Sequence, residues 1–83
     1  MAKQESELRV DVATAKLEAT QAKADRAEKD WRRAQQLLPQ NAISASDADE
    51  IECNYKVAQA GVKEATAELE IAKLSLLPKK GKR

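Results

Sequence analysis

The chain has 83 residues and a formal net charge of +1; hydrophobic residues make up 42%, aromatic residues only 2%, and there are two glycines and two prolines. This composition argues against a β-sandwich or barrel, which needs turn residues and β-branched or aromatic strands, and is typical of long helices. There is no histidine, and Cys53 is the single cysteine. These counts argue against a zinc site, a Ser-His or Cys-His catalytic pair and an intrachain disulfide. We therefore expect no enzyme, no metal and no cofactor.

The first predicted helix covers about residues 6–38, because this stretch contains neither Gly nor Pro. Its uncharged residues form two rows. One row consists of Val10, Leu17, Ala24, Trp31 and Leu38, and the other of Ala13, Thr20, Ala27 and Ala34. The alternating spacing of three and four residues is typical of a coiled-coil seam.

Residues 39–45 are the predicted tip loop, which begins at a proline. We expect Leu37 and Ile43 to be exposed there, together with two arginines, Arg32 and Arg33. Ile43 has two compatible interpretations: it packs on the first turn of the next helix as a hydrophobic staple, or it meets a partner.

The second predicted helix covers about residues 46–77. Its start is marked by Ser44 with Asp47 as a capping box, and Ser46 with Asp49 offers the same signal two residues later. Its uncharged rows are Ala48, Tyr55, Val62, Leu69 and Leu76, and Ile51, Ala58, Ala65 and Ala72.

Folding the chain back at the loop pairs the two seams layer by layer. The layers run from Leu38 with Ala48 near the tip, through Leu17 with Leu69, to Val10 with Leu76 at the base. The sequence therefore predicts an all-α fold with two long antiparallel helices that form one coiled-coil hairpin, a single domain over residues 1–83.

Further apolar residues lie beside each seam. On the first helix they are Leu8, Val12, Ala15, Ala19 and Ala22; on the second they are Val57, Ala60, Ala67, Ile71 and Leu74. They either broaden the core or form a second contact face for another hairpin. On the latter interpretation Val57, Ile71 and Leu74 are lateral packing residues, and packing is strongest at the base, away from the loop.

A basic tail, residues 78–83, ends the chain. It is interpreted as a solubilising end or a remnant of the expression vector, and it offers a phosphate contact as an alternative. Neither helix is expected to carry a one-sided basic face, so no nucleic-acid partner is expected.

The tip segment, Arg33-Ala-Gln-Gln-Leu37-Leu-Pro-Gln-Asn-Ala-Ile-Ser44, resembles the hairpin tip of periplasmic adaptor proteins, the membrane fusion proteins of the HlyD type. Tips of that family carry an Arg, a Leu four residues later and a Ser eleven residues later. Arg33, Leu37 and Ser44 have this spacing. The aliphatic Ile43 before the serine and the acidic Asp47 after it also fit the family.

The resemblance implies a function in efflux or type I secretion. Adaptor hairpins line up as a homo-oligomeric tube, and their tips dock on a TolC-type outer-membrane channel. Arg33, Leu37, Ile43 and Ser44 would form the partner-binding tip. The family connects to an inner-membrane transporter through further domains that are missing here, which indicates an excised or truncated fragment of a membrane-anchored periplasmic protein. The alternative is a structural coiled-coil oligomerisation module whose tip is inert.

Overall fold

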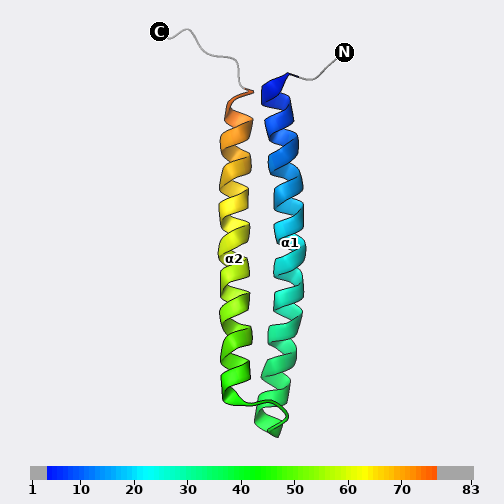
Figure 1. Ribbon diagram of the computed structural model, residues 1–83, viewed down its shortest axis with the longest axis vertical. Helices are drawn as coiled ribbons and strands as arrows, with labels where there is room; N and C mark the ends of the chain where they lie inside the picture. Colours follow the sequence, from blue (N-terminus) through cyan, green and yellow to red (C-terminus); the bar gives the residue numbers. More distant parts are fainter. Residues whose placement is uncertain (1–3, 77–83) are drawn as a thin grey trace.

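The computed structural model describes residues 4–76, which form two long antiparallel helices joined at one end (Figure 1). Helix α1 is Glu5–Leu37, a short 3-10 helix η1 is Leu38–Gln40, and α2 is Ala45–Leu74. The predicted all-α antiparallel hairpin is confirmed. The predicted basic tail lies outside the described residues.

Each helix forms because good helix formers run without a proline, and each end has hydrogen-bond partners. The backbone N–H of Gln4 donates to Glu7 Oε1 at 3.2 Å at the start of α1. At the end of α2, the Ser75 backbone N–H and hydroxyl both donate to the Ala72 carbonyl, at 3.2 and 2.6 Å. A helix of 33 residues is about 50 Å long at 1.5 Å per residue, so the molecule is a thin rod.

The core is a narrow seam of small side chains between the helices. Its buried residues are Ala13, Ala24, Ala34, Ala48, Ala65 and Leu69. All six belong to the predicted rows, but five are alanines, so little apolar surface is buried per turn. At the two ends the predicted seam is open: Leu38 is 39% and Leu76 is 44% exposed. The expectation that these two leucines close the end layers is wrong, because the helices stop before both positions.

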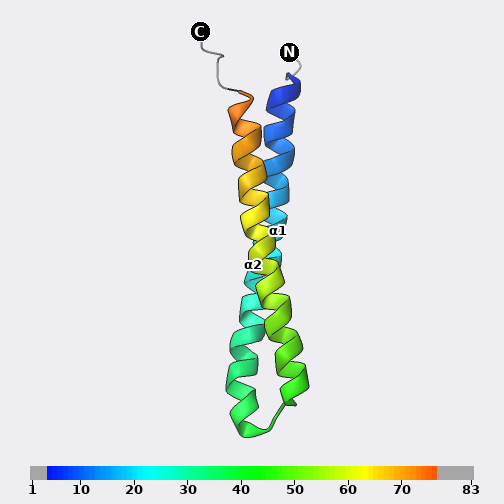
Figure 2. The same cartoon turned by 90° about the vertical axis from the view of Figure 1, so that its left-hand side faces the viewer.

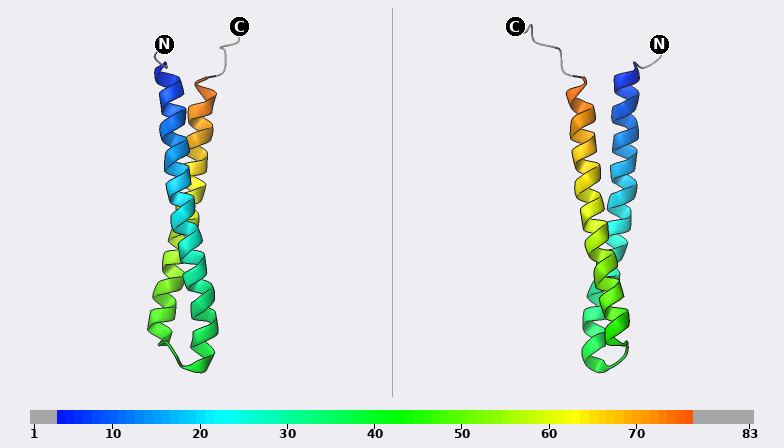
Figure 3. Two further views of the ribbon diagram at one scale, coloured as in Figure 1. Left: turned by 90° about the vertical axis from the view of Figure 1, so that its right-hand side faces the viewer. Right: turned by 60° about the vertical axis from the view of Figure 1, so that its left-hand side comes forward.

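The helices approach each other closely and cross over along their length (Figures 2 and 3). A Cβ added to Gly61 would lie 3.3 Å from Thr20 Cγ2, so glycine permits this close approach. The Thr20 hydroxyl donates to the Lys16 carbonyl of its own helix at 2.7 Å, which satisfies the polar group in the seam.

Among residues 4–76, an ion pair joins the two helices: Lys16 Nζ lies 2.9 Å from Glu68 Oε1. It sits beside Leu17 and Leu69, in agreement with their predicted pairing in one layer. Glu68 raises the pKa of Lys16, first through the side-chain hydrogen bond and then through its charge. Both side chains are about half exposed, so the pair favours the register more than it adds stability.

Candidate functional site

The tip is a capped turn with a fixed geometry. Pro39 has no N–H to continue the α-helical pattern, so α1 ends at Leu37 and one 3-10 turn follows. Asn41 then adopts a left-handed conformation with φ 58°. Its N–H donates to the Leu38 carbonyl and the Ala42 N–H donates to the Leu37 carbonyl, both at 3.0 Å. This pattern is a Schellman motif with Asn in the place that Gly usually takes.

Ser44 begins α2 as its N-cap. Its extended backbone presents the hydroxyl oxygen to the Asp47 N–H, which donates at 3.0 Å, and the Ala48 N–H donates to the Ser44 carbonyl at 3.0 Å. The structure therefore selects the first of the two possible capping signals, and Ser46 lies inside the helix. The chain is consequently held on both sides of the turn.

Leu37 and Ile43 meet at a small hollow of about 130 Å³ just above the turn. Ala34 and Ile51 line its apolar part, and Asp30 and Arg33 border it. Leu37 and Ile43 are half-buried, so they are less exposed than the sequence led us to expect. Leu37, the last residue of α1, lines the hollow together with Ile51 of α2, whereas Leu38, the first residue of the 3-10 turn, is 39% exposed.

Arg33 borders the hollow, and its cationic end is exposed to solvent. Its Nη1 lies 3.7 Å from Asp30 Oδ1, beyond hydrogen-bond distance, and its side chain is 69% exposed. The neighbouring Arg32 differs, because its Nη2 lies 2.6 Å from Glu28 Oε2 on its own helix. Of the two arginines, Arg33 is therefore the one available to an acceptor on a partner.

The structure brings three of the four predicted tip residues together. Arg33, Leu37 and Ile43 border one hollow, whereas Ser44 is occupied as a helix cap. Sequence reasoning missed Asn41, whose left-handed conformation reverses the chain, although an Asn two residues after Pro39 is a recognisable signal for such a turn. It also missed Leu38 as the exposed leucine of the tip.

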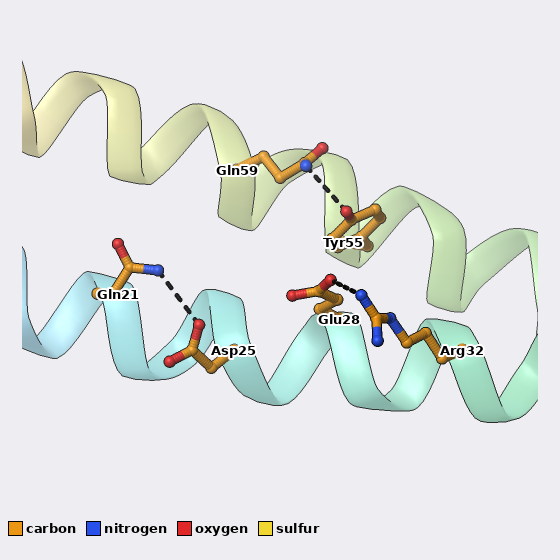
Figure 4. A network of polar contacts seen from close by, with 6 residues as sticks. All are labelled: Gln21, Asp25, Glu28, Arg32, Tyr55 and Gln59. Atoms are coloured by element: carbon orange, nitrogen blue, oxygen red, sulfur yellow. Dashed lines mark hydrogen bonds and ion pairs between the residues drawn. The ribbon is translucent and has the colours of Figure 1, made fainter.

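Midway along the rod, polar side chains cover one edge of the seam (Figure 4). Three hydrogen bonds each stay within one helix: Gln21 to Asp25 at 3.2 Å, Glu28 with Arg32 at 2.6 Å, and Gln59 to the Tyr55 hydroxyl at 2.9 Å. Each of these side chains has a hydrogen-bond partner one helical turn away. The flank therefore has the character of a solvated helix surface.

The lateral residues lie outside the core. Val57, Ile71 and Leu74 are 63–66% exposed, and Leu8 and Val12 on α1 are exposed as well. This excludes the interpretation of a broadened core stripe, since such residues would be covered by the other helix. The hairpin thus has aliphatic side chains on its outside, concentrated toward the base.

Within residues 4–76, no group of three or more His, Cys, Asp or Glu side chains is arranged to hold a metal ion. In the same part of the chain, neither helix is apolar over a long enough stretch to cross a membrane. Cys53 is exposed with a free thiol.

A rod of two antiparallel helices with a capped tip places the chain in the class of α-helical hairpin domains. A comparison with protein families matches residues 9–77 to the family described as "RND MFP, alpha-helical hairpin domain". The chain belongs to this family, the hairpin domain of RND-type membrane fusion proteins, which confirms the resemblance to adaptor hairpins. Comparisons with curated proteins and with solved structures gave no match.

Proposed function

We propose that this chain is the hairpin by which a periplasmic adaptor of a tripartite efflux pump or type I secretion system docks, tip first, on a TolC-type outer-membrane channel. The observation that carries the proposal is the tip itself: Arg33, Leu37 and Ile43 border one open hollow at the end of the rod. The family membership supports an adaptor role. No catalysis is proposed, since the family is an adaptor domain.

Docking follows from simple chemistry at the tip. A partner side chain that fills the hollow would bury the partly exposed faces of Leu37 and Ile43, at about 25 cal/mol per Å² of apolar surface. Arg33 would donate charge-assisted hydrogen bonds to carbonyls or carboxylates at the rim. The turn is already fixed by the Asn41 and Ser44 caps, so little conformational entropy is lost on binding.

The other partners follow from the same assignment. Neighbouring hairpins of the same adaptor would stand beside this one, with Val57, Ile71 and Leu74 at the lateral contact. An inner-membrane transporter would be reached through other adaptor domains. The location is the periplasm, as part of a membrane-anchored adaptor.

The test is capture of the chain by a panel of outer-membrane channel proteins, with crosslinking from the tip to trap weak contacts. Arg33→Ala should weaken capture about tenfold or more, because a hydrogen bond to a charged group contributes about 1.5–3 kcal/mol. Arg32→Ala is the matched control, since it removes the same charge from a residue already paired with Glu28. Leu37→Ser should also lose capture while helicity by circular dichroism stays normal.

A second function is favoured by the exposed aliphatic residues at the base: a structural oligomerisation module with an inert tip. In that case, polar substitutions at Val57, Ile71 and Leu74 break self-association, whereas tip substitutions change nothing. Equal capture of wild type, Arg33→Ala and Leu37→Ser would exclude docking by the tip and favour this module.

A further inference from the structure

The hollow above the turn (the tip hollow) has a rim of mixed charge, because Asp30 and Arg33 both border it from α1. Asp30 Oδ1 lies 3.7 Å from Arg33 Nη1, and Asp30 Oδ2 lies 3.7 Å from Arg26 Nε. Both distances exceed the range of a hydrogen bond. In the part of the chain that the structure describes, Asp30 has no closer partner. The rim therefore offers a hydrogen-bond acceptor and a donor that lie near each other without bonding to each other.

The Asp30 carboxylate is also less accessible to water than its two neighbours. Its side chain is 40% exposed, compared with 69% for Arg33 and 81% for Arg26. The other side chains around the hollow are apolar, namely Ala34, Leu37, Ile43 and Ile51. A partly buried carboxylate gains more from a hydrogen bond than an exposed one does, because water satisfies it less completely. A partner that donates to Asp30 would supply this bond.

The mixed rim restricts which chemical group fits. A carboxylate suits Arg33 but is repelled by Asp30, and a basic side chain suits Asp30 but is repelled by Arg33. A peptide group of the backbone is planar and trans, so its C=O and N–H point in opposite directions and cannot reach both residues from one edge. A hydroxyl must direct both hydrogen bonds through a single oxygen, so the two bonds cannot both be straight across this gap.

A primary carboxamide, the head group of Asn and Gln side chains, satisfies both residues. It presents an acceptor oxygen and a donor NH2 on one edge. These two atoms are about 2.2 Å apart, given bond lengths of about 1.23 Å for C=O and about 1.33 Å for C–N. Two nearly parallel hydrogen bonds of about 2.9 Å therefore connect this edge to a pair of protein atoms that are 3.7 Å apart.

We propose that the tip hollow recognises a side-chain carboxamide, from an Asn or Gln of the outer-membrane channel. Arg33 donates to the amide oxygen, and Asp30 accepts from the NH2 group. The methylene groups of the partner side chain lie on Leu37 and Ile43. The channel as the source of the amide rests on the proposed function, whereas the recognition itself is a property of this chain and is tested on its own.

Asp30 is thereby a specificity residue, because its charge keeps carboxylates away from Arg33. Asp30→Asn removes this charge and introduces an NH2 group that can itself donate to a carboxylate. The variant should therefore prefer a carboxylate to an amide. A merely structural role of Asp30 would not produce this reversal, since damage to the helix would weaken the binding of every ligand alike.

The test uses the full chain and four small probes, without any channel protein. Butyramide carries a primary carboxamide on a short aliphatic chain. N-methylbutyramide carries a trans secondary amide, butyrate a carboxylate and 1-butanol a hydroxyl. Each probe is titrated into the ¹⁵N-labelled chain, and the backbone amide shifts of Asp30, Arg33 and Leu37 are followed by NMR. Butyramide should bind about tenfold or more tightly than the others, because none of these satisfies both charged groups.

Two variants of equal charge make the result specific. In Asp30→Asn, butyrate should bind at least as tightly as butyramide. Glu28→Gln is the matched control, since it removes one negative charge from a residue of α1 outside the tip hollow and should keep the preference for butyramide. Circular dichroism checks that both variants stay helical. The absence of shifts at the tip with butyramide, equal binding of all four probes, or an Asp30→Asn variant that still excludes butyrate would each overturn the proposal.

The outcome is distinguishable from that of the docking test. Capture by a channel that depends on Arg33, without a preference for butyramide, would keep docking by the tip and remove carboxamide recognition. A preference for butyramide without capture by any channel would keep the carboxamide site and remove the channel as its partner.

Discussion

Leu69 is the largest of the six buried side chains in the described part of the chain, since the other five are alanines, and its truncation should cost measurable stability. Leu69 is 8% exposed. Leu69→Ala deletes three carbon groups at about 0.8 kcal/mol each, or roughly 2.4 kcal/mol before any cavity cost. For a domain of this size, 1 kcal/mol shifts the Tm by about 4–8 °C. We therefore expect a Tm lower by about 10–20 °C.

The assay is thermal unfolding followed by circular dichroism at low micromolar concentration, where lateral contacts between chains are minimal. Leu74→Ala is the matched control, because Leu74 is exposed and should change stability by less than about 0.5 kcal/mol. Equal Tm shifts for the two variants would refute the reasoning, because they would mean that the seam does not hold the hairpin together.

Three further predictions concern the caps and the interhelical ion pair. Ser44→Ala should lower the free energy of unfolding by about 1 kcal/mol in urea denaturation, because it removes the cap of α2, whereas Ser46→Ala should leave it unchanged. The reverse order would show that α2 begins two residues later. Asn41→Val should lower the free energy of unfolding by about 1–2 kcal/mol in the same assay, because a β-branched residue resists a positive φ. Asn41→Gly should not lower it, because glycine adopts this conformation readily. Equal losses of stability in the two variants would contradict a left-handed turn. Glu68 raises the pKa of Lys16 above 10.5, so the stabilisation by this pair is present below that pH and is lost as the pH rises through the raised value. Glu68→Gln should thus be less stable than wild type at about pH 8, and a stability difference that does not narrow toward about pH 12 would contradict this assignment.

The heptad rows show how far sequence reasoning reaches and where it stops. Every buried residue was predictable, because apolar side chains at a spacing of three and four residues must share one face of a helix. The rows were wrongly extended through Leu38 and Leu76, since periodicity carries no information on where a helix ends. The end of α1 depends on Pro39 and on the left-handed Asn41, and these local features exchange the environments of Leu37 and Leu38.

At the tip, too, the sequence predicted some features and the structure was needed for others. The spacing of Arg33, Leu37 and Ser44 indicated the candidate site, and Ser44 was expected to cap α2. The sequence did not reveal that Arg33, Leu37 and Ile43 border one hollow while Ser44 turns to its own helix. That arrangement depends on how the Schellman turn sets the two helix ends against each other.

The sequence by itself determined the two helices, their antiparallel pairing and the residues of the seam, because all three follow from periodicity and from one interruption at the tip. Only the tertiary structure decided which side chains the partner helix leaves uncovered. Ala-rich helices lie close together and cover only a narrow strip of each other. Val57, Ile71 and Leu74 therefore stay outside the core, exposed on the surface of the hairpin.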